Sequence, residues 1–467
     1  MKEGNLKHME GKTKKVGLDL TQGPVLRELL IFVGPVIIAN LIQQLYSLVD
    51  LVVIGAYMGS TGTVGVSTGG EMADMLMPVA QALGAAGQIY IAQLLGAREH
   101  KKLKETIGTM ISFMILTSLV FFIIIIVFRI QILNLLNCPA EAFSQADQYV
   151  IWTAIGYPFI FGYNAVAGIL QGMGESKRPL LFIVIAATVN IFLDILLVGP
   201  FHMESAGAAI ATTASQAASF IASLVYMYQH REHFEFELKP AYFRIRWSAL
   251  KVILSLGIPQ ACRSLLVRFS MLYVNASVNA YGLVESATNS VGNKLQKFLE
   301  IYTSSFSQAG SAMVAQNLGA KKPERAKKTV LYSFYSCLIL AAVTSAIIVI
   351  WPKPVFGIFT HDANVLSLGV IYLQILVVHI FLSAMTSSFQ TMVIGSGNAK
   401  LNFLIGVLDG VICKIGLSLI FVYLFDMGVY GFFCGTALSR LLPGLMNVWY
   451  FCSGRWNRRK LLNGESQ

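Results

Sequence analysis

Apolar runs of about 20 residues recur along almost the whole chain, and no other feature limits the possible folds as strongly. Runs of this length cross the hydrocarbon core of a bilayer as α-helices, because a helix rises ~1.5 Å per residue and the core is about 30 Å thick. Only 13% of the 467 residues are charged, whereas a soluble domain carries roughly a quarter. The sequence therefore predicts an all-α polytopic membrane protein and excludes a large soluble fold.

Twelve such runs are separated by loops. We expect helices over residues 25–49, 62–95, 106–128, 147–171, 180–199 and 205–229, followed by 248–279, 284–316, 328–350, 365–394, 401–424 and 428–452. Lys and Arg concentrate in alternate loops, such as residues 98–104 and 321–328, and at both termini. Because positively charged loops stay in the cytoplasm, both termini are predicted to be cytoplasmic. These loops explain the net charge of +11, so it gives no indication of nucleic-acid binding.

The two halves of the chain repeat each other. Pro35 pairs with Pro259, and AQLLGAREHKK pairs with AQNLGAKKPER. Because each half has an even number of helices, the halves enter the membrane from the same side and are related by a pseudo-twofold axis along its normal. We predict an N-lobe at 25–229, a cytoplasmic linker at 230–247, a C-lobe at 248–452, and cytoplasmic tails at 1–24 and 453–467. Two such lobes around a cleft can alternate access by rocking.

Two acidic residues lie inside apolar runs. Asp194 lies in AATVNIFLDILLV and Asp50 lies in LYSLVDLVVIG. A charge at the bilayer centre costs about 2.5–3.5 kcal/mol on insertion scales, so an acid there indicates a functional site. Asn190 lies one turn before Asp194 on the same helix face. If the two helices face each other, the acids form an oxygen-rich site for a proton or a small hard cation. The alternative is a structural hydrogen-bonding role at a helix contact.

Several segments, taken in order, resemble the multidrug and toxic compound extrusion (MATE) transporters over essentially the whole chain. They are Gly34-Pro35, Gln44 through Asp50, AQLLGA at 92–97, QGMG at 171–174, Asn190-xxx-Asp194 and GAAIAT at 207–212. The chain is most similar to the DinF-like branch of prokaryotic members. The resemblance implies twelve transmembrane helices in two six-helix lobes, a location in the cell's inner (plasma) membrane, and ion-coupled export without enzyme activity.

The resemblance also implies roles for particular residues. Pro35 would be the residue about which the first helix bends. Other family members have acids on the seventh and tenth helices, but here the seventh carries Arg263 and Arg268, so no second cation site is expected. The cation site of the N-lobe, for H⁺ or Na⁺, would comprise Asp50, Asn164, Asn190, Asp194 and Thr212.

Aromatic, methionine and charged side chains inside the runs could present an adaptable surface to varied drugs. The candidates for this cavity are Tyr46, Tyr163, Glu71, Met75, Arg268 and Lys294. The alternative is that they pack, face lipid or extend to the membrane interface. The six cysteines are scattered singly, so we expect no metal site beyond Na⁺. No GxxxxGK[ST] motif is present, so an ion gradient is expected to drive transport without a cofactor.

The sequence thus predicts a secondary antiporter that exports amphipathic, cationic compounds in exchange for H⁺ or Na⁺ by alternating access. Its partners would be small organic substrates and the lipid bilayer, and a single chain would suffice. One alternative is a lipid-linked saccharide flippase of the same superfold, whose basic C-lobe residues would bind a pyrophosphate. Another is an intramembrane enzyme, for which His379 is the single histidine deep in a helix and has no clear acidic companion.

Overall fold

The computed structural model describes residues 17–231, 243–462 and 464, which form helices joined by short loops, with no strand in those ranges. The first half comprises α1 (Val25–Gly96), α2 (His100–Leu135), α3 (Ala140–Ile155), α4 (Tyr157–Gly172), α5 (Lys177–Val198) and α6 (Glu204–Gln229). The second half comprises α7 (Trp247–Asn279), α8 (Leu283–Gly319), α9 (Pro323–Ile350), α10 (Pro352–Gly357), α11 (Ala363–Gly395), α12 (Ala399–Val407), the π-helices η2 (Leu408–Leu417) and η3 (Ile420–Leu424), α13 (Val429–Leu438), α14 (Leu441–Cys452) and the short 3₁₀-helix η4 (Arg455–Arg458).

The predicted twelve crossings are present. Nine helical segments of the described chain are long and apolar enough to cross a membrane, and the α3–α4 pair, bent by 44°, makes a tenth. The other two are α8 and the α13–α14 pair. α8 has 37 residues, which is ample length for a crossing. It is less apolar than the others because one of its faces is polar.

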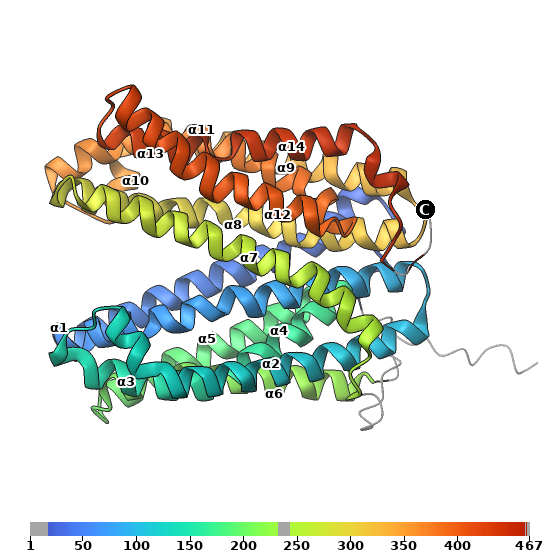
Figure 1. Ribbon diagram of the computed structural model, residues 1–467, viewed down its shortest axis with the longest axis horizontal. Coiled ribbons are helices and arrows are strands. Elements are labelled where there is room, and N and C mark those ends of the chain that lie inside the picture. Colours follow the sequence, from blue (N-terminus) through green and yellow to red (C-terminus); the bar gives the residue numbers. More distant parts are fainter. Residues whose placement is uncertain (1–16, 232–242, 463, 465–467) are drawn as a thin grey trace, which may run out of the picture.

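Figure 1 shows the two predicted lobes, with α2 to α6 in the lower part of the view and α7 to α14 in the upper part. The all-α, two-lobe architecture is therefore confirmed. The predicted linker at 230–247 falls largely on residues outside the described ranges, as do most of the predicted tail at 1–24 and the last residues of the tail at 453–467.

The way in which helices are joined or interrupted differs from the prediction in three places. The expected helices 25–49 and 62–95 are joined in α1, whose two crossings are Val25–Met58 and Gly62–Gly96. The connection contains no proline, and the helix continues where a loop was expected. The expected helix 147–171 is the α3–α4 pair, which bends at Gly156 just before Pro158. The expected helix 428–452 is interrupted between α13 and α14.

The first helix of each half begins against the opposite lobe. Buried residues from Leu20 to Val36 belong to a hydrophobic core with α8 and α9. Buried residues from Ala249 to Leu256, at the start of α7, belong to the core of the N-lobe. The paired prolines, Pro35 and Pro259, therefore lie where each helix leaves the opposite lobe. Because proline removes a helix hydrogen bond, both crossings have a weakened backbone ladder at this point.

The lobes touch at the end of the molecule that carries the basic loops, which we call the basic end. A Cβ added to Gly96 would lie 2.0 Å from the Gln316 carbonyl oxygen, and one added to Gly319 would lie 2.2 Å from the Gln93 carbonyl oxygen. Only glycine permits backbones to approach this closely. The contact is reciprocal because the four residues come from the matching AQLLG and AQNLG segments. It therefore follows the twofold repeat.

We predict that Gly96→Val or Gly319→Val opens the basic end. Overpacking of this kind costs about 1–3 kcal/mol, so the closed population should fall roughly 5- to 150-fold. Distances between spin labels placed on the two lobes at this end would measure the change. Gly416→Ala is the matched control, because a Cβ there would meet nothing within 4 Å. Unchanged distance distributions in both valine variants would show that these glycines do not close the lobes.

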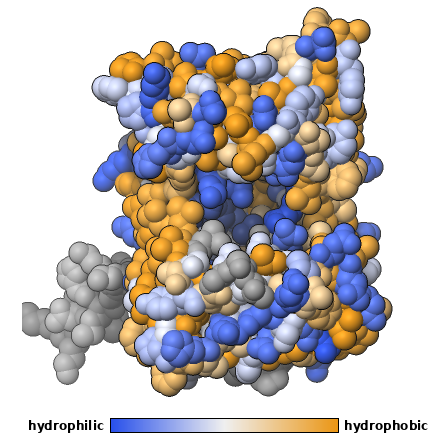
Figure 2. Space-filling view, turned by 90° about the vertical axis from the view of Figure 1, so that its left-hand side faces the viewer, coloured by the Kyte–Doolittle hydropathy of each residue, from blue (hydrophilic) through white to orange (hydrophobic). Residues whose placement is uncertain are grey.

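The opposite end, which we call the hollow end, is open between the lobes. Figure 2 shows this end with a central hollow in which hydrophilic residues lie. α8 carries exposed polar residues at three- and four-residue spacing, including Lys294, Lys297, Ser304 and Gln308. Exposed polar side chains along a membrane-spanning helix indicate contact with water rather than lipid. α8 therefore faces the hollow.

Candidate functional site

The N-lobe carboxylates lie where α1 and α5 pack together. Asp50 on α1 and Asp194 on α5 are close enough for their carboxyl groups to interact, and Asn190 interacts with Asp194. Asp194 is 1% exposed and Asn190 is 2% exposed, while Asp50 is partly buried. The two helices therefore face each other, and the predicted pairing of Asp50 with Asp194 is present.

Four buried oxygen atoms of this cluster have no hydrogen-bond donor among the described residues. They are Oδ1 of Asp50, Oδ1 of Asn190 and both carboxylate oxygens of Asp194. Leaving a buried polar atom unpaired costs about 1–3 kcal/mol, and more for a charged one. A proton held between the carboxyl groups would relieve this cost, and so would a small hard cation, which takes oxygen ligands. The donor set fits either ion.

The two other predicted ligands lie on neighbouring helices and are partly buried. Asn164 on α4 donates from Nδ2 to the Ile160 carbonyl, at 2.8 Å. The Thr212 carbonyl on α6 accepts from the Ser215 hydroxyl, at 2.7 Å. Within the described ranges, neither side chain hydrogen-bonds to the carboxylate pair. The structure thus brings three of the five predicted residues into contact and places the other two on helices of the same lobe.

The predicted drug-cavity residues are divided between the two lobes. Tyr46 and Tyr163 interact with each other in the N-lobe. Glu71 and Met75 are exposed on the second crossing of α1. The remaining two lie in the other lobe, where Lys294 is exposed on α8 and Arg268 is partly buried on α7. The drug cavity therefore remains a prediction.

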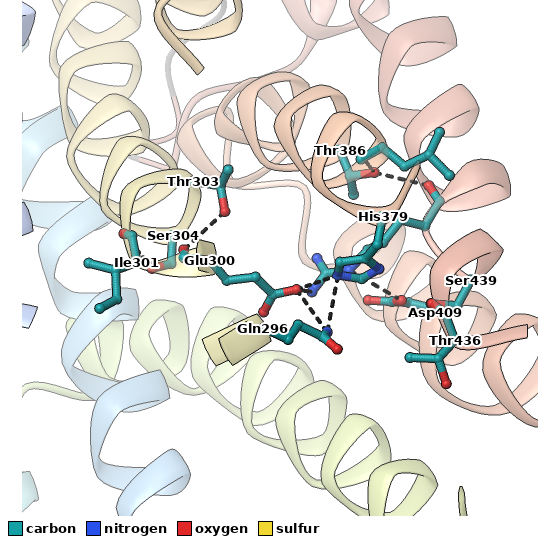
Figure 3. A network of polar contacts seen from close by, with 12 residues as sticks. Gln296, Glu300, Ile301, Thr303, Ser304, His379, Thr386, Asp409, Thr436 and Ser439 are labelled. Atoms are coloured by element: carbon teal, nitrogen blue, oxygen red, sulfur yellow. Dashed lines mark hydrogen bonds and ion pairs between the residues drawn. The ribbon is translucent and has the colours of Figure 1, made fainter. Parts of the chain in front are cut away.

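A second group of charged side chains, the C-lobe cluster, comprises Glu300, His379, Asp409, Lys414 and Arg440. Glu300 Oε1 lies 2.6 Å from His379 Nε2 and 3.3 Å from Arg440 Nη2. Arg440 Nε lies 3.7 Å from Asp409 Oδ1. Figure 3 shows Glu300 extending from α8 toward His379 on α11, with Gln296 beside both.

The prediction that His379 has no clear acidic companion is wrong. Glu300 is its partner, at a sequence separation of 79 residues. Helical periodicity shows which residues share a face of one helix, but it does not show which helix packs against that face. Sequence reasoning also misses Arg440, although an arginine inside the apolar run 428–452 is a signal in its own right.

Asp409 and Lys414 are brought together by a local change of helix type. They are five positions apart in the sequence, which corresponds to roughly 140° around an α-helix with 3.6 residues per turn. The segment Leu408–Leu417 is a π-helix, and its i to i+5 hydrogen bonds bring residues five apart to one side. Asp409 is 1% exposed and Lys414 is 4% exposed, and the two interact.

Comparison with known proteins gives a consistent result in both halves of the chain. A family model described as MatE matches residues 35–196 and 259–424, one match in each lobe. The probable multidrug resistance protein YpnP of Bacillus subtilis (strain 168) is 25% identical over 455 residues, covering 95% of this chain and 98% of the relative. The probable multidrug resistance protein YoeA of the same strain is 26% identical over 350 residues, covering 74% and 76%.

The fold is also found among solved structures. One of them is described as the outward-facing conformation of a multidrug resistance MATE family transporter of the MOP superfamily. It superposes with a TM-score of 0.88 at 19% sequence identity and covers 95% of this chain and 98% of its own. At this identity the similarity concerns the fold, which agrees with the two lobes described above.

Proposed function

Because the chain belongs to the MatE family, we propose that it is a secondary antiporter that exports amphipathic, cationic organic compounds in exchange for H⁺ or Na⁺. The observation that carries this proposal is the set of unpaired buried oxygens contributed by Asp50, Asn190 and Asp194. Relatives named as multidrug resistance proteins support drug export and do not favour the flippase alternative. They also support transport rather than an enzyme activity.

The proposed orientation places the basic end in the cytoplasm of a bacterial cell, because Lys and Arg of short loops stay on that side of the plasma membrane. The hollow then opens to the outside. Asp194 lies four residues before the end of α5 at Val198, so the carboxylate pair is nearer the hollow end. A cation arriving from outside would reach the pair through the hollow.

In the proposed cycle, ion binding at Asp50 and Asp194 neutralises the buried carboxylates and accompanies release of the drug to the outside. Asn164 and Thr212 would supply further oxygens if the N-lobe tightens around the ion. Pro35, where α1 leaves the C-lobe core, would absorb the bend that such a change requires. The lobes would then close at the hollow end and open at the basic end to receive the next drug.

The drug itself would bind between the lobes. Tyr46, Tyr163 and Met75 would provide aromatic and polarizable surface, and Glu71 would favour cationic compounds. The basic residues Arg268 and Lys294 would contact water or anionic groups on the other wall. One chain contains both lobes and the whole cleft, so we propose that it works as a monomer.

The first test measures which gradient drives export in vesicles that contain the wild-type protein. Ethidium transport would be followed with a pH gradient at equal Na⁺, and separately with a Na⁺ gradient at equal pH. We expect one of the two to drive export, and a 100-fold ion gradient can sustain a dye ratio of at most about 100-fold for one ion per drug. Collapse of the gradient with an ionophore is the control. Absence of export under either gradient, for ethidium and other cationic dyes, would contradict the antiporter and favour the flippase.

A further inference from the structure

Near both ends of the chain, a short non-helical segment contacts both lobes at the basic end. The N-terminal strap, residues 17–24, precedes α1, and the C-terminal strap, residues 459–462, follows η4. Each contains a buried leucine, Leu20 at 0% exposure and Leu461 at 4%. The ends of a chain are ordinarily poorly ordered unless contacts hold them in place. These two straps are held by specific contacts.

The N-terminal strap bonds to both lobes through its backbone. On the N-lobe side, Leu18 N donates to the Gly174 carbonyl in the turn between α4 and α5, at 3.0 Å. On the C-lobe side, Leu20 N donates to Gln316 Oε1, at 3.0 Å, and Asn317 Nδ2 donates to the Leu20 carbonyl, at 3.1 Å. The Leu20 side chain belongs to the hydrophobic core that includes α8 and α9. This strap therefore joins the lobes.

Basic side chains at the start of α9 strengthen the C-lobe attachment of the N-terminal strap. Lys322 Nζ donates to the Thr21 carbonyl, at 2.8 Å. Arg325 donates to three further carbonyls of the strap, those of Leu20, Gln22 and Gly23. Hydrogen bonds from charged donors are roughly twice as strong as neutral ones. If the lobes separate, we expect this strap to stay on the C-lobe and to part from the N-lobe at Leu18.

The C-terminal strap makes the corresponding connection from the other end of the chain. Leu462 N donates to Gln93 Oε1 of the N-lobe, at 3.0 Å, and the Leu462 side chain packs against the N-lobe core. On the C-lobe side, Leu461 belongs to a hydrophobic core, and Arg459 Nη2 donates to the Gly397 carbonyl, at 3.1 Å. Figure 1 shows the last part of the chain, in red, running from the upper lobe toward the lower one.

The straps bind to matching positions of the twofold repeat. Gln93 and Gln316 are the glutamines of AQLLG and AQNLG, and each accepts from the backbone N–H of a strap leucine. Gly174 and Gly397 also match, in QGMGESK and VIGSGNAK, and each contacts a strap. Repetition of a lobe explains the matching glutamines. It does not explain why two different segments, from opposite ends of the chain, occupy both of them.

We propose that the two straps hold the lobes together at the basic end and that each must release one lobe before this end opens. A strap that is bonded to both lobes opposes their separation for as long as both attachments persist. The strap-binding glutamines lie three residues before the glycines at which the backbones of the two lobes meet. The straps thus act beside the point of closest approach. The inference concerns closure of the lobes and does not depend on which ion or drug is carried.

Distances between spin labels on the two lobes at the basic end, measured on the full chain in nanodiscs, test the straps. Gly17→Ala should displace the N-terminal strap, because the added Cβ would lie 2.7 Å from the Met173 carbonyl oxygen. Leu462→Pro removes the N–H that donates to Gln93. We expect each variant to raise the ratio of open to closed molecules about fivefold, which is about 1 kcal/mol, the net contribution of one hydrogen bond.

The double variant and a matched control complete the distance measurement. If the straps act independently, Gly17→Ala with Leu462→Pro should raise the ratio about 25-fold. Gly464→Ala is the control for Gly17→Ala. Both glycines have positive φ, +92° and +86°, but a Cβ at Gly464 would meet nothing within 4 Å. The control should keep the wild-type distances, and unchanged distances in both single variants and the double variant would overturn the inference.

Hydrogen exchange of the strap amides gives a second measurement that requires no change in the straps. Because coupling between two events is reciprocal, a substitution that opens the basic end should also release the straps. In Gly96→Val we therefore expect faster exchange of the Leu18 and Leu462 amide hydrogens than in the wild type. If Gly96→Val opens the basic end while both amides keep their wild-type protection, the lobes rock with the straps attached. That result would overturn the role of the straps and leave alternating access intact.

Discussion

Asp194→Asn is expected to reduce the export ratio of ethidium from at most about 100-fold, under a 100-fold ion gradient, to about 1. Exchange of one monovalent cation for another moves no net charge, so the ion concentration gradient alone sets the ratio that the wild type can sustain. The amide has nearly the same shape as the carboxyl group but cannot carry its charge or exchange its proton. Asp50→Asn should have the same effect, because the two carboxyl groups interact.

The measurement compares gradient-driven ethidium export by the variants at equal amounts of inserted protein. Asp147→Asn on α3 is the control, because it is the same chemical change at a partly exposed acid that pairs with Arg129 at 2.8 Å. We expect the control to retain export within about twofold, since exposed pairs contribute roughly 0–1 kcal/mol. Wild-type export in both Asp50→Asn and Asp194→Asn would refute the N-lobe site.

Arg440→Met is expected to destabilise the protein by up to about 3–5 kcal/mol, because it removes the guanidinium that Glu300 and Asp409 share and leaves them with only His379 and Lys414 as basic neighbours. Arg440 lies within ion-pair distance of both Glu300 and Asp409, and the Asp409 side chain is only 2% exposed. When one member of a buried charge network is removed, the remaining charges stay buried but lose part of the attraction that offset their loss of hydration. Thermal unfolding in detergent, followed by a spectroscopic signal of helix content, would show a lowered Tm.

Arg129→Met is the matched comparison for this prediction. The Arg129–Asp147 pair is 28% and 25% exposed, whereas Arg440 and Asp409 are 16% and 2% exposed, so loss of the Arg129 pair should cost less, about 1 kcal/mol. Adding Glu300→Gln to Arg440→Met should restore part of the lost stability, because one of the two acids that lost the guanidinium is neutralised. Equal Tm losses for Arg440→Met and Arg129→Met would show that the buried network contributes no more than a surface ion pair.

Much of the architecture could be predicted from local pattern. Hydrocarbon offers no hydrogen-bond partners, so each crossing must be a helix of sufficient apolar length, and the number of crossings follows from the number of runs. The sequence predicts the crossing made by α8 in spite of its polar face, because apolar residues recur along the whole helix. The connection between the two crossings of α1 was not predictable in this way, since the absence of proline permits a helix as readily as a loop.

The candidate sites were predictable only in part. Asp50, Asn190 and Asp194 stand out because polar side chains are rare inside apolar runs, and an acid with an amide one turn earlier indicates a shared face. The partner of His379 did not stand out. Glu300 lies on a helix with many polar residues, so one further polar residue there does not indicate a site. It is also 79 residues from the histidine in the sequence.

The sequence by itself determined the helical class, the twofold repeat and the presence of buried carboxylates, because these depend on hydropathy and spacing within single segments. Only the tertiary structure decided that Asp50 meets Asp194, that Gly96 and Gly319 close the basic end, and that Glu300 meets His379. Those contacts join helices that are distant in the chain. They depend on how helix faces pack, which the residue order within one helix does not specify.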